Sequence, residues 1–129
     1  MLDVALLPGE YAVCRLAAGS PVPATLWGEL GGADVVTVSW TTDGISVICP
    51  AARVPVGATV ETDWRCLRVV GPLDLAVTGT LAALVDPLAA ARVSVVAFST
   101  FDTDHLLVPA VRLTEATGAL ERAGHRVLR

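Results

Sequence analysis

Lysine is absent from this sequence of 129 residues, and all nine basic side chains are arginines. The arginines are spread singly along the chain, and the formal net charge is −4. A nucleic-acid surface needs clustered basic residues that neutralise several phosphates at once. We therefore expect no nucleic-acid partner.

Long uninterrupted apolar runs are missing too, although 53% of the residues are hydrophobic. Asp86 and Pro87 interrupt the apolar stretch 81–91, whereas a membrane-spanning helix needs about 20 consecutive apolar residues. Residues 1–3 do not begin a secretory signal, which has a basic segment followed by an apolar run. We expect a cytoplasmic protein without a membrane partner. Part of its apolar surface is expected to lie in a homodimer interface.

Histidine and cysteine are scarce, with two histidines and three cysteines in the chain. Cys14, Cys49 and Cys66 lie far apart in strand-like runs, which argues against a disulfide framework and against a zinc site. We expect them to be small buried side chains in a reducing compartment. No nucleophile, base and acid combine into a catalytic site. We therefore expect no enzymatic activity, and we assign no cofactor and no metal.

Runs rich in valine, isoleucine and aromatic residues, bounded by glycine, proline or aspartate, predict β-strands. They cover residues 11–16, 35–41, 45–49, 64–70, 93–99 and 106–108. The C-terminal residues 125–128 are expected to form a further, closing strand.

Apolar residues at helical spacing predict a helix over residues 80–91, with Pro87 weakening or kinking it near its middle. Its buried face is expected to consist of Leu81, Leu84, Val85 and Leu88. A second helix is expected from about residue 111 to 123, with Gly124 as its stop. The C-terminal half therefore has the predicted order β-α-β-β-α-β.

The two halves overlay when the chain is displaced by 59 positions. Residues 50–54 then match residues 109–113, and Asp43 matches Asp102. Identities spaced in register over such a window predict a duplication. The first half is the reduced copy, because it has only a short helical stretch near residues 25–30. We expect residues 1–60 to form the degenerate unit and residues 61–129 the complete one.

Two segments of the second half, residues 71–80 and 99–105, hold most of the polar side chains near strand ends. Gly79 at a helix start lets a ligand approach backbone N–H groups, whose partial positive charge favours a carboxylate. Asp102 and Asp104 offer acceptors for an ammonium or guanidinium group. A site with donors at one end and carboxylates at the other suits a free amino acid.

Structural roles are the alternative for each of these residues. Gly79 suits a turn, Thr80 a helix N-cap and Asp102 an Asx turn. Asp104 begins a strand where its repeat partner is the apolar Ile45, and a partly buried aspartate needs a partner from the protein or from a ligand.

A structural Asp104 would be paired with Arg68 or with another internal donor. A metal site formed by Asp102, Asp104 and His105 is a further alternative. Strand alternation argues against it, because it sends His105 to the face opposite Asp104.

The same segments contain a set of motifs with a family pattern. They are Gly71-Pro72-Leu73-Asp74, Thr78-Gly79, Ser99-Thr100-Phe101-x-x-Asp104-His105-x-Leu107-Val108-Pro109 and Gly124-His125. The sequence resembles the ACT domain family, in the subgroup related to the cytosolic arginine sensor of the mammalian TOR pathway. The resemblance covers nearly the whole chain. It implies an α+β fold of two ferredoxin-like βαββαβ units in tandem, with a small ligand held between neighbouring ACT units.

The resemblance also implies a set of ligand contacts. Gly79 would meet the α-carboxylate or amine end, and the Asp104 carboxylate would meet the distal end. The expected ligand-binding residues are Asp74, Thr78, Gly79, Thr80, Thr100, Phe101, Asp102, Thr103 and Asp104. This chain has two ACT units where the sensor has four, so that dimerisation would complete the site. Thr103 stands where the resemblance leads us to expect an aromatic residue.

We expect a sensor or regulatory protein that binds a small molecule, an amino acid, without catalysing a reaction. The alternative is an ACT-like interaction or assembly module that binds no ligand.

Overall fold

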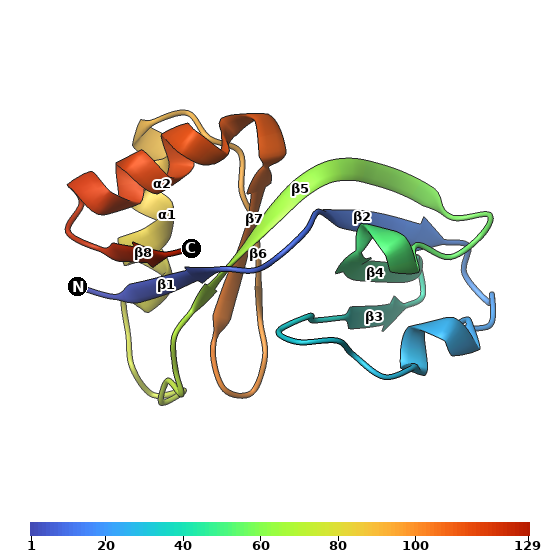
Figure 1. Cartoon of the computed structure of the whole chain (residues 1–129). Coiled ribbons are helices and arrows are strands. Elements are labelled where there is room, and N and C mark those ends of the chain that lie inside the picture. The colour runs from blue at the N-terminus through green and yellow to red at the C-terminus, as the bar shows by residue number, and fades with distance from the viewer. The chain divides into compact units, whose positions relative to one another are not determined.

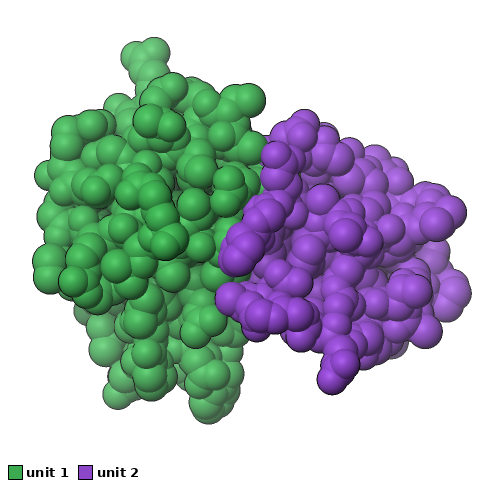
Figure 2. Space-filling view, viewed as in Figure 1, with its two compact units in different colours: residues 1–7, 64–129 green, residues 8–63 purple.

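The computed structural model describes residues 1–129, which divide into two compact units. Unit 1 consists of residues 1–7 and 64–129, and unit 2 consists of residues 8–63 (Figures 1 and 2). None of the helices is long and apolar enough to cross a membrane.

The sheet of unit 1 has the strand order β8-β1-β5-β7-β6, and two helices belong to this unit (Figure 1). Its strands are β1 (Asp3–Leu6), β5 (Thr59–Val69), β6 (Val96–Ser99), β7 (Asp104–Pro109) and β8 (Arg126–Leu128). The helices are α1 (Thr80–Ala90) and α2 (Leu113–Arg122), preceded by the 3-10 turn η3 (Ala110–Arg112). From β5 to β8 the elements follow the predicted order β-α-β-β-α-β, and the fold class is α+β as expected.

Strand β1 was not expected from the sequence. It pairs antiparallel with β5, where Val4 lies opposite Val69, and parallel with β8, where Val4 lies opposite Val127. The sheet is therefore mixed, and the N-terminal residues 1–7 belong to the same compact unit as residues 64–129. The repeat boundary expected between residues 60 and 61 stays a prediction.

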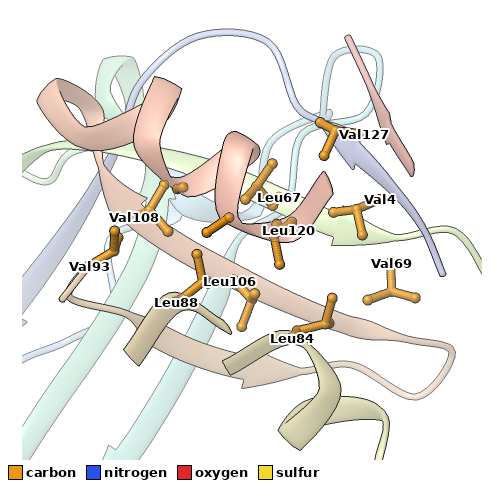
Figure 3. Close-up of a cluster of buried hydrophobic side chains, with 12 residues drawn as sticks. Val4, Leu67, Val69, Leu84, Leu88, Val93, Leu106, Val108, Leu120 and Val127 are labelled. Carbon is orange, nitrogen blue, oxygen red and sulfur yellow. The ribbon is translucent and has the colours of Figure 1, made fainter. Parts of the chain in front are cut away.

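The core of unit 1 lies between one face of this sheet and the two helices (Figure 3). The sheet contributes alternate residues such as Leu67 and Val69 of β5 and Leu106 and Val108 of β7. Helix α1 contributes Leu84 and Leu88, and α2 contributes Ala116 and Leu120. Burial of these apolar side chains is the main term that holds the helices on the sheet.

Helix α1 includes Pro87 and continues to Ala90, close to the predicted end at residue 91, and the weakening or kink expected at Pro87 stays a prediction. One expectation for its buried face was wrong. Leu81 remains 41% exposed, because the buried stripe is centred on Leu84 and Leu88. A proline cannot donate to the carbonyl four residues earlier, and the Ala83 carbonyl lies instead 2.9 Å from His125 Nε2.

Unit 2 is poor in helices, as expected. Its strands β2 and β3 flank β4 and pair with it antiparallel. The elements are β2 (Tyr11–Leu16), η1 (Ala24–Trp27), β3 (Thr37–Thr41), β4 (Gly44–Pro50) and η2 (Ala51–Arg53). The helical stretch expected near residues 25–30 is the 3-10 turn η1, which ends where Gly28 adopts an extended backbone.

The three cysteines are free and buried, as the sequence predicts. Cys14 and Cys49 belong to the core of unit 2, with Ile45 and Val47, and Cys66 lies on β5. Burial raises the pKa of Cys49 and the pKa of Cys66 to about 12.

The strand pairing supports the duplication. Every residue pair between β6 and β7 has a counterpart 59 positions earlier between β3 and β4, so that Ser99 opposite Asp104 corresponds to Trp40 opposite Ile45. The turns η2 and η3 are displaced by the same interval. The copies diverge immediately afterwards, because α2 follows η3 whereas Pro55 and Gly57 follow η2.

Candidate functional site

Two loops of unit 1 lie side by side at one end of the sheet. They are residues 70–79, between β5 and α1, and residues 100–103, between β6 and β7. The Leu73 N–H donates to the Asp102 carbonyl at 2.7 Å, and the Thr103 hydroxyl donates to the Val69 carbonyl at 2.6 Å. These bonds hold the first loop against the second.

Gly71 permits this close approach. A Cβ atom at this position would lie 3.0 Å from the Leu73 nitrogen and 3.1 Å from the Asp102 carbonyl oxygen. Both are backbone atoms that cannot move away cheaply, so a larger residue would separate the two loops.

A pocket of about 220 Å³ opens between the loops and the start of helix α1; we call it the loop pocket. It is lined by Leu73, Asp74, Leu75, Val77, Thr80, Ser99, Thr100, Thr103 and Asp104. Five expected ligand-binding residues are brought together there, namely Asp74, Thr80, Thr100, Thr103 and Asp104. Their identification as ligand contacts stays a prediction.

Four expected residues do not line the loop pocket. Phe101 is 83% exposed at the tip of its loop, and the Asp102 side chain is exposed while its carbonyl accepts from Leu73. Thr78 is exposed as well. Gly79 is the N-cap of α1, with a left-handed backbone at φ 82°.

Asp104 is held by a residue that the sequence analysis did not assign to the site. Its Oδ1 atom accepts a hydrogen bond of 2.6 Å from the Ser99 hydroxyl. Ser99 is thus an internal donor of the kind expected for a structural Asp104, whereas Arg68 lies opposite His105 in the pairing of β5 with β7. Ser99 could have been found from the hairpin, because the turn 100–103 places residue 99 opposite residue 104.

Asp74 shapes the other wall of the loop pocket. Its Oδ1 atom accepts a hydrogen bond of 2.9 Å from the Ala76 N–H, and its carbonyl accepts one of 3.0 Å from the Val77 N–H. This arrangement is an Asx turn. The Asx turn that the sequence suggested for Asp102 is thus found at Asp74.

The polar groups of the loop pocket are unevenly distributed. Its side chains include two carboxylates, Asp74 and Asp104, and no cationic group. Thr80 begins helix α1, which has no side-chain cap and no acidic residue in its first turn. The first N–H groups of such a helix carry partial positive charge. The loop pocket therefore offers acceptors from the aspartates and donors from the helix.

His105 lies outside the loop pocket, on the opposite face of the sheet from Asp104. It is buried and stacks on Phe98, with ring centroids 4.8 Å apart. Burial lowers the pKa of His105, the charge of Arg68 lowers it further, and Asp104 opposes both effects. Because strand alternation separates Asp104 from His105, the two side chains do not converge on a common metal position.

Comparison with known proteins identifies the family. A model of the ACT domain matches residues 59–122, and a model of an N-terminal domain matches residues 9–57. Protein Atu0741 from Agrobacterium tumefaciens is 32% identical with a TM-score of 0.87, over 98% of this chain and 92% of that chain. No curated protein gives a significant match. The chain belongs to the ACT domain family.

More distant structures share the fold alone. Protein VC0802 from Vibrio cholerae, a protein of unknown function described as a possible transport protein, is 18% identical with a TM-score of 0.72. The match covers 95% of this chain and 89% of that chain. The regulatory subunit of aspartate kinase from Thermus thermophilus, in a ligand-free form, is 14% identical with a TM-score of 0.65. That match covers 94% of this chain and 97% of that chain, so the fold resembles a regulatory subunit.

Proposed function

We propose that this protein is a sensor or regulatory protein that binds an amino acid in the loop pocket and catalyses no reaction. One observation carries the proposal: the loop pocket combines aspartate acceptors with the uncapped start of a helix. An amino acid has an ammonium group and a carboxylate, which fit these two kinds of group. A relation to the arginine-sensor subgroup is part of the same proposal.

Asp104 is the proposed contact for the ligand's ammonium group. The Ser99 hydroxyl donates a hydrogen bond to Oδ1 of Asp104, and Oδ2 has no hydrogen-bond partner within the chain. A carboxylate can accept several hydrogen bonds, so Asp104 can hold Ser99 and a ligand at the same time. The ligand's carboxylate would lie at Thr80, against the first N–H groups of α1.

The size of the loop pocket supports a small ligand. Its volume of about 220 Å³ suits a single amino acid better than a nucleotide or a peptide. ACT domains typically bind small molecules, and the proposal follows that pattern for the family to which the chain belongs.

A thermal-shift screen of the full chain against the twenty amino acids tests the proposal. Binding to the folded state alone stabilises a protein by about 2.7 kcal/mol at a ligand concentration of 100 times Kd. At least one amino acid is expected to raise Tm in a concentration-dependent way. Asp102→Asn is the control, because its side chain does not line the loop pocket, and it should respond as the wild type does. If no amino acid raises Tm, the proposal is wrong and the assembly module is favoured.

A further inference from the structure

Unit 2 lacks an element that corresponds to helix α2. In unit 1, α2 follows the turn η3 and packs against α1, β7 and β8 (Figure 1). In unit 2 the matching turn η2 is followed only by residues 54–58, after which β5 begins at Thr59. Gly57 adopts a left-handed backbone at φ 85° within this short connection. The second helix position of unit 2 is therefore not filled by a helix of that unit.

An apolar groove lies at this position; we call it the η2 groove. Its volume is about 550 Å³, and it is lined by residues 52–56 together with Pro23 and Thr25. The displacement by 59 positions matches residues 52–56 to residues 111–115, which form the end of η3 and the first turn of α2. The η2 groove thus corresponds to the place where α2 begins in the other unit.

Equivalent arginines hold the first helical element in both units. In unit 1, Arg112 donates to the carbonyls of the two residues that follow α1, at 3.3 and 3.4 Å. In unit 2, its counterpart Arg53 donates to the carbonyl of Thr25 at 3.3 Å and to the carbonyl of Glu29. The 3-10 turn η1 therefore takes the place of α1, and the correspondence of the two units extends beyond their strands.

The two arginines differ in their ionic partner. Arg112 forms an ion pair with Glu115, which lies in the first turn of α2. The residue that matches Glu115 is Val56, and Arg53 forms no ion pair. Arg53 thus lines an apolar groove without a carboxylate partner. A helix placed there as α2 is placed in unit 1 would bring an acidic residue of its first turn to Arg53.

Apolar surface continues along η1 beyond the η2 groove. Trp27 is 70% exposed and Leu30 is 48% exposed, and both line a second hollow of about 430 Å³. Gly28 lines the same hollow, and a Cβ atom at this position would lie 3.5 Å from Arg53 Nη1. The two hollows therefore adjoin at Arg53. An extended apolar surface of this kind suits the apolar face of an amphipathic helix.

We propose that unit 2 binds an amphipathic helix of a partner protein, which fills the η2 groove with its apolar face and pairs an acidic residue of its first turn with Arg53. A helix is favoured over an extended strand because α2 occupies the equivalent position in unit 1. A second copy of this chain is not the partner, because the apolar faces of α1 and α2 are buried in the core of unit 1. The proposal goes beyond ligand binding, since every residue that lines the loop pocket belongs to unit 1.

A peptide with the sequence of α2 is the probe, because that helix fits the equivalent position of unit 1. It covers residues 113–124 and is kept helical by a chemical link between positions 118 and 122, which lie outside the buried face of α2. Fluorescence anisotropy of the labelled peptide with the full chain should show saturable binding. The same peptide with Glu115→Lys should bind at least about fivefold more weakly, because its charge is repelled by Arg53.

Val56→Glu places within the chain the carboxylate that the partner helix would supply. The new carboxylate should pair with Arg53 and weaken binding of the unmodified peptide at least about tenfold, since it also places a charge under the apolar face of the peptide. Val111→Glu is the matched control, because Val111 is an 87% exposed valine of unit 1 outside the η2 groove. This variant should bind the peptide as the wild type does. Val56 is itself fully exposed, so both variants should keep the fold.

Amide chemical shifts locate the bound peptide in the full chain. The changes on addition of the peptide should be centred on η1 and residues 52–58. Changes centred on α2 of unit 1 would show exchange with the chain's own helix and would overturn the proposal. So would the absence of binding at a peptide concentration of about 1 mM, equal affinity of the two peptides, or equal affinity of Val56→Glu and the wild type.

Discussion

His125 is the hydrogen-bond partner of the Ala83 carbonyl, to which Pro87 cannot donate because it has no N–H. The carbonyl oxygen of Ala83 lies four residues before Pro87, which has no N–H to donate, and His125 Nε2 lies 2.9 Å from it. The Leu2 N–H donates to His125 Nδ1 at 3.2 Å, so the ring proton is on Nε2. One neutral imidazole thus joins helix α1, the start of β8 and the N-terminal segment.

We expect His125→Leu to lower the free energy of unfolding by about 2–3 kcal/mol, because two hydrogen bonds are lost and a carbonyl is left unpaired. Pro87→Ala supplies an N–H for the Ala83 carbonyl, so the same histidine change should cost about 1 kcal/mol less in that background. Urea unfolding of the two single variants and the double variant measures this coupling. Strict additivity would show that the contact between His125 and Ala83 does not compensate for the proline.

Helices α1 and α2 end in the same way, but with different residues. After α1 the Val93 N–H donates to the Leu88 carbonyl, and after α2 the His125 N–H donates to the Leu120 carbonyl. The residue before each donor has a left-handed backbone, and it is Arg92 in one case and Gly124 in the other. This is the Schellman motif, in which glycine is favoured at that position.

Arg92→Gly should therefore stabilise the protein by about 0.5–1 kcal/mol, because a left-handed backbone disfavours a residue with a Cβ atom. Gly124→Ala should destabilise it by about 1 kcal/mol for the same reason. Arg92→Ala is the control, since it removes the guanidinium but keeps the Cβ atom. If Arg92→Ala stabilises as much as Arg92→Gly in urea unfolding, the effect comes from the lost charge.

Local patterns predicted the elements of the second half well. Helix α2 was placed within two residues at its start and one at its end, because apolar periodicity and Gly124 mark it. Strand β1 was missed, since four residues carry little periodicity and its stability comes from β5 and β8 at the far end of the chain. The contact of His125 Nε2 with the Ala83 carbonyl could not be foreseen, because the two residues lie 42 positions apart in the chain.

The loop pocket was predictable in outline for a similar reason. The sequence located it through the polar segments 71–80 and 99–105 near the strand ends, where glycine and aspartate indicate loops. Which side chains face inward depends on backbone contacts between the loops, such as that of Leu73 with Asp102. This explains why the sequence could not show that the side chains of Asp102 and Phe101 lie outside the loop pocket and that Ser99 lines it. Whether Asp102 and Phe101 contact a ligand stays a prediction.

Stability should fall as the pH is lowered from about 6.5, in part because of His105. Burial keeps the pKa of folded His105 below its ordinary value of 6.5, so the unfolded chain binds more protons between the two values. The stabilisation is complete above pH 6.5 and is lost as the pH falls toward the folded-state pKa. In urea unfolding from pH 8 to 5, the free energy of unfolding of the wild type should fall relative to that of His105→Leu as the pH falls. A difference that is constant over this range contradicts the assignment.

The thiols should be unreactive in the folded protein. Burial raises the pKa of Cys49 and Cys66 to about 12, and burial raises the pKa of Cys14 as well. Only the thiolate reacts with disulfide reagents. At pH 8 we expect slow labelling by an aromatic disulfide such as Ellman's reagent, and fast labelling of all three thiols in denaturant. Fast labelling without denaturant would show that at least one thiol is accessible.

Asp104→Asn separates a ligand contact from a structural role. The change keeps the Oδ1 acceptor for Ser99 and removes the charge, so the free energy of unfolding without ligand should change by less than about 1 kcal/mol. A charge-assisted hydrogen bond to an ammonium group contributes about 1.5–3 kcal/mol, and its loss should weaken binding about 10- to 100-fold. The titration uses the amino acid with the largest thermal shift in the screen.

Ser99→Ala distinguishes the roles further, because it removes the partner of Asp104 and leaves the carboxylate in place. We expect Ser99→Ala to lower binding less than Asp104→Asn does, since the charge that meets the ammonium group remains. The two measurements are independent: urea unfolding without ligand reports the structural role, and isothermal titration reports the contact. A loss of more than about 3 kcal/mol in ligand-free Asp104→Asn, the size expected for a broken buried ion pair, would assign Asp104 to the fold. Unchanged affinity in that variant would remove Asp104 from the site even if an amino acid binds.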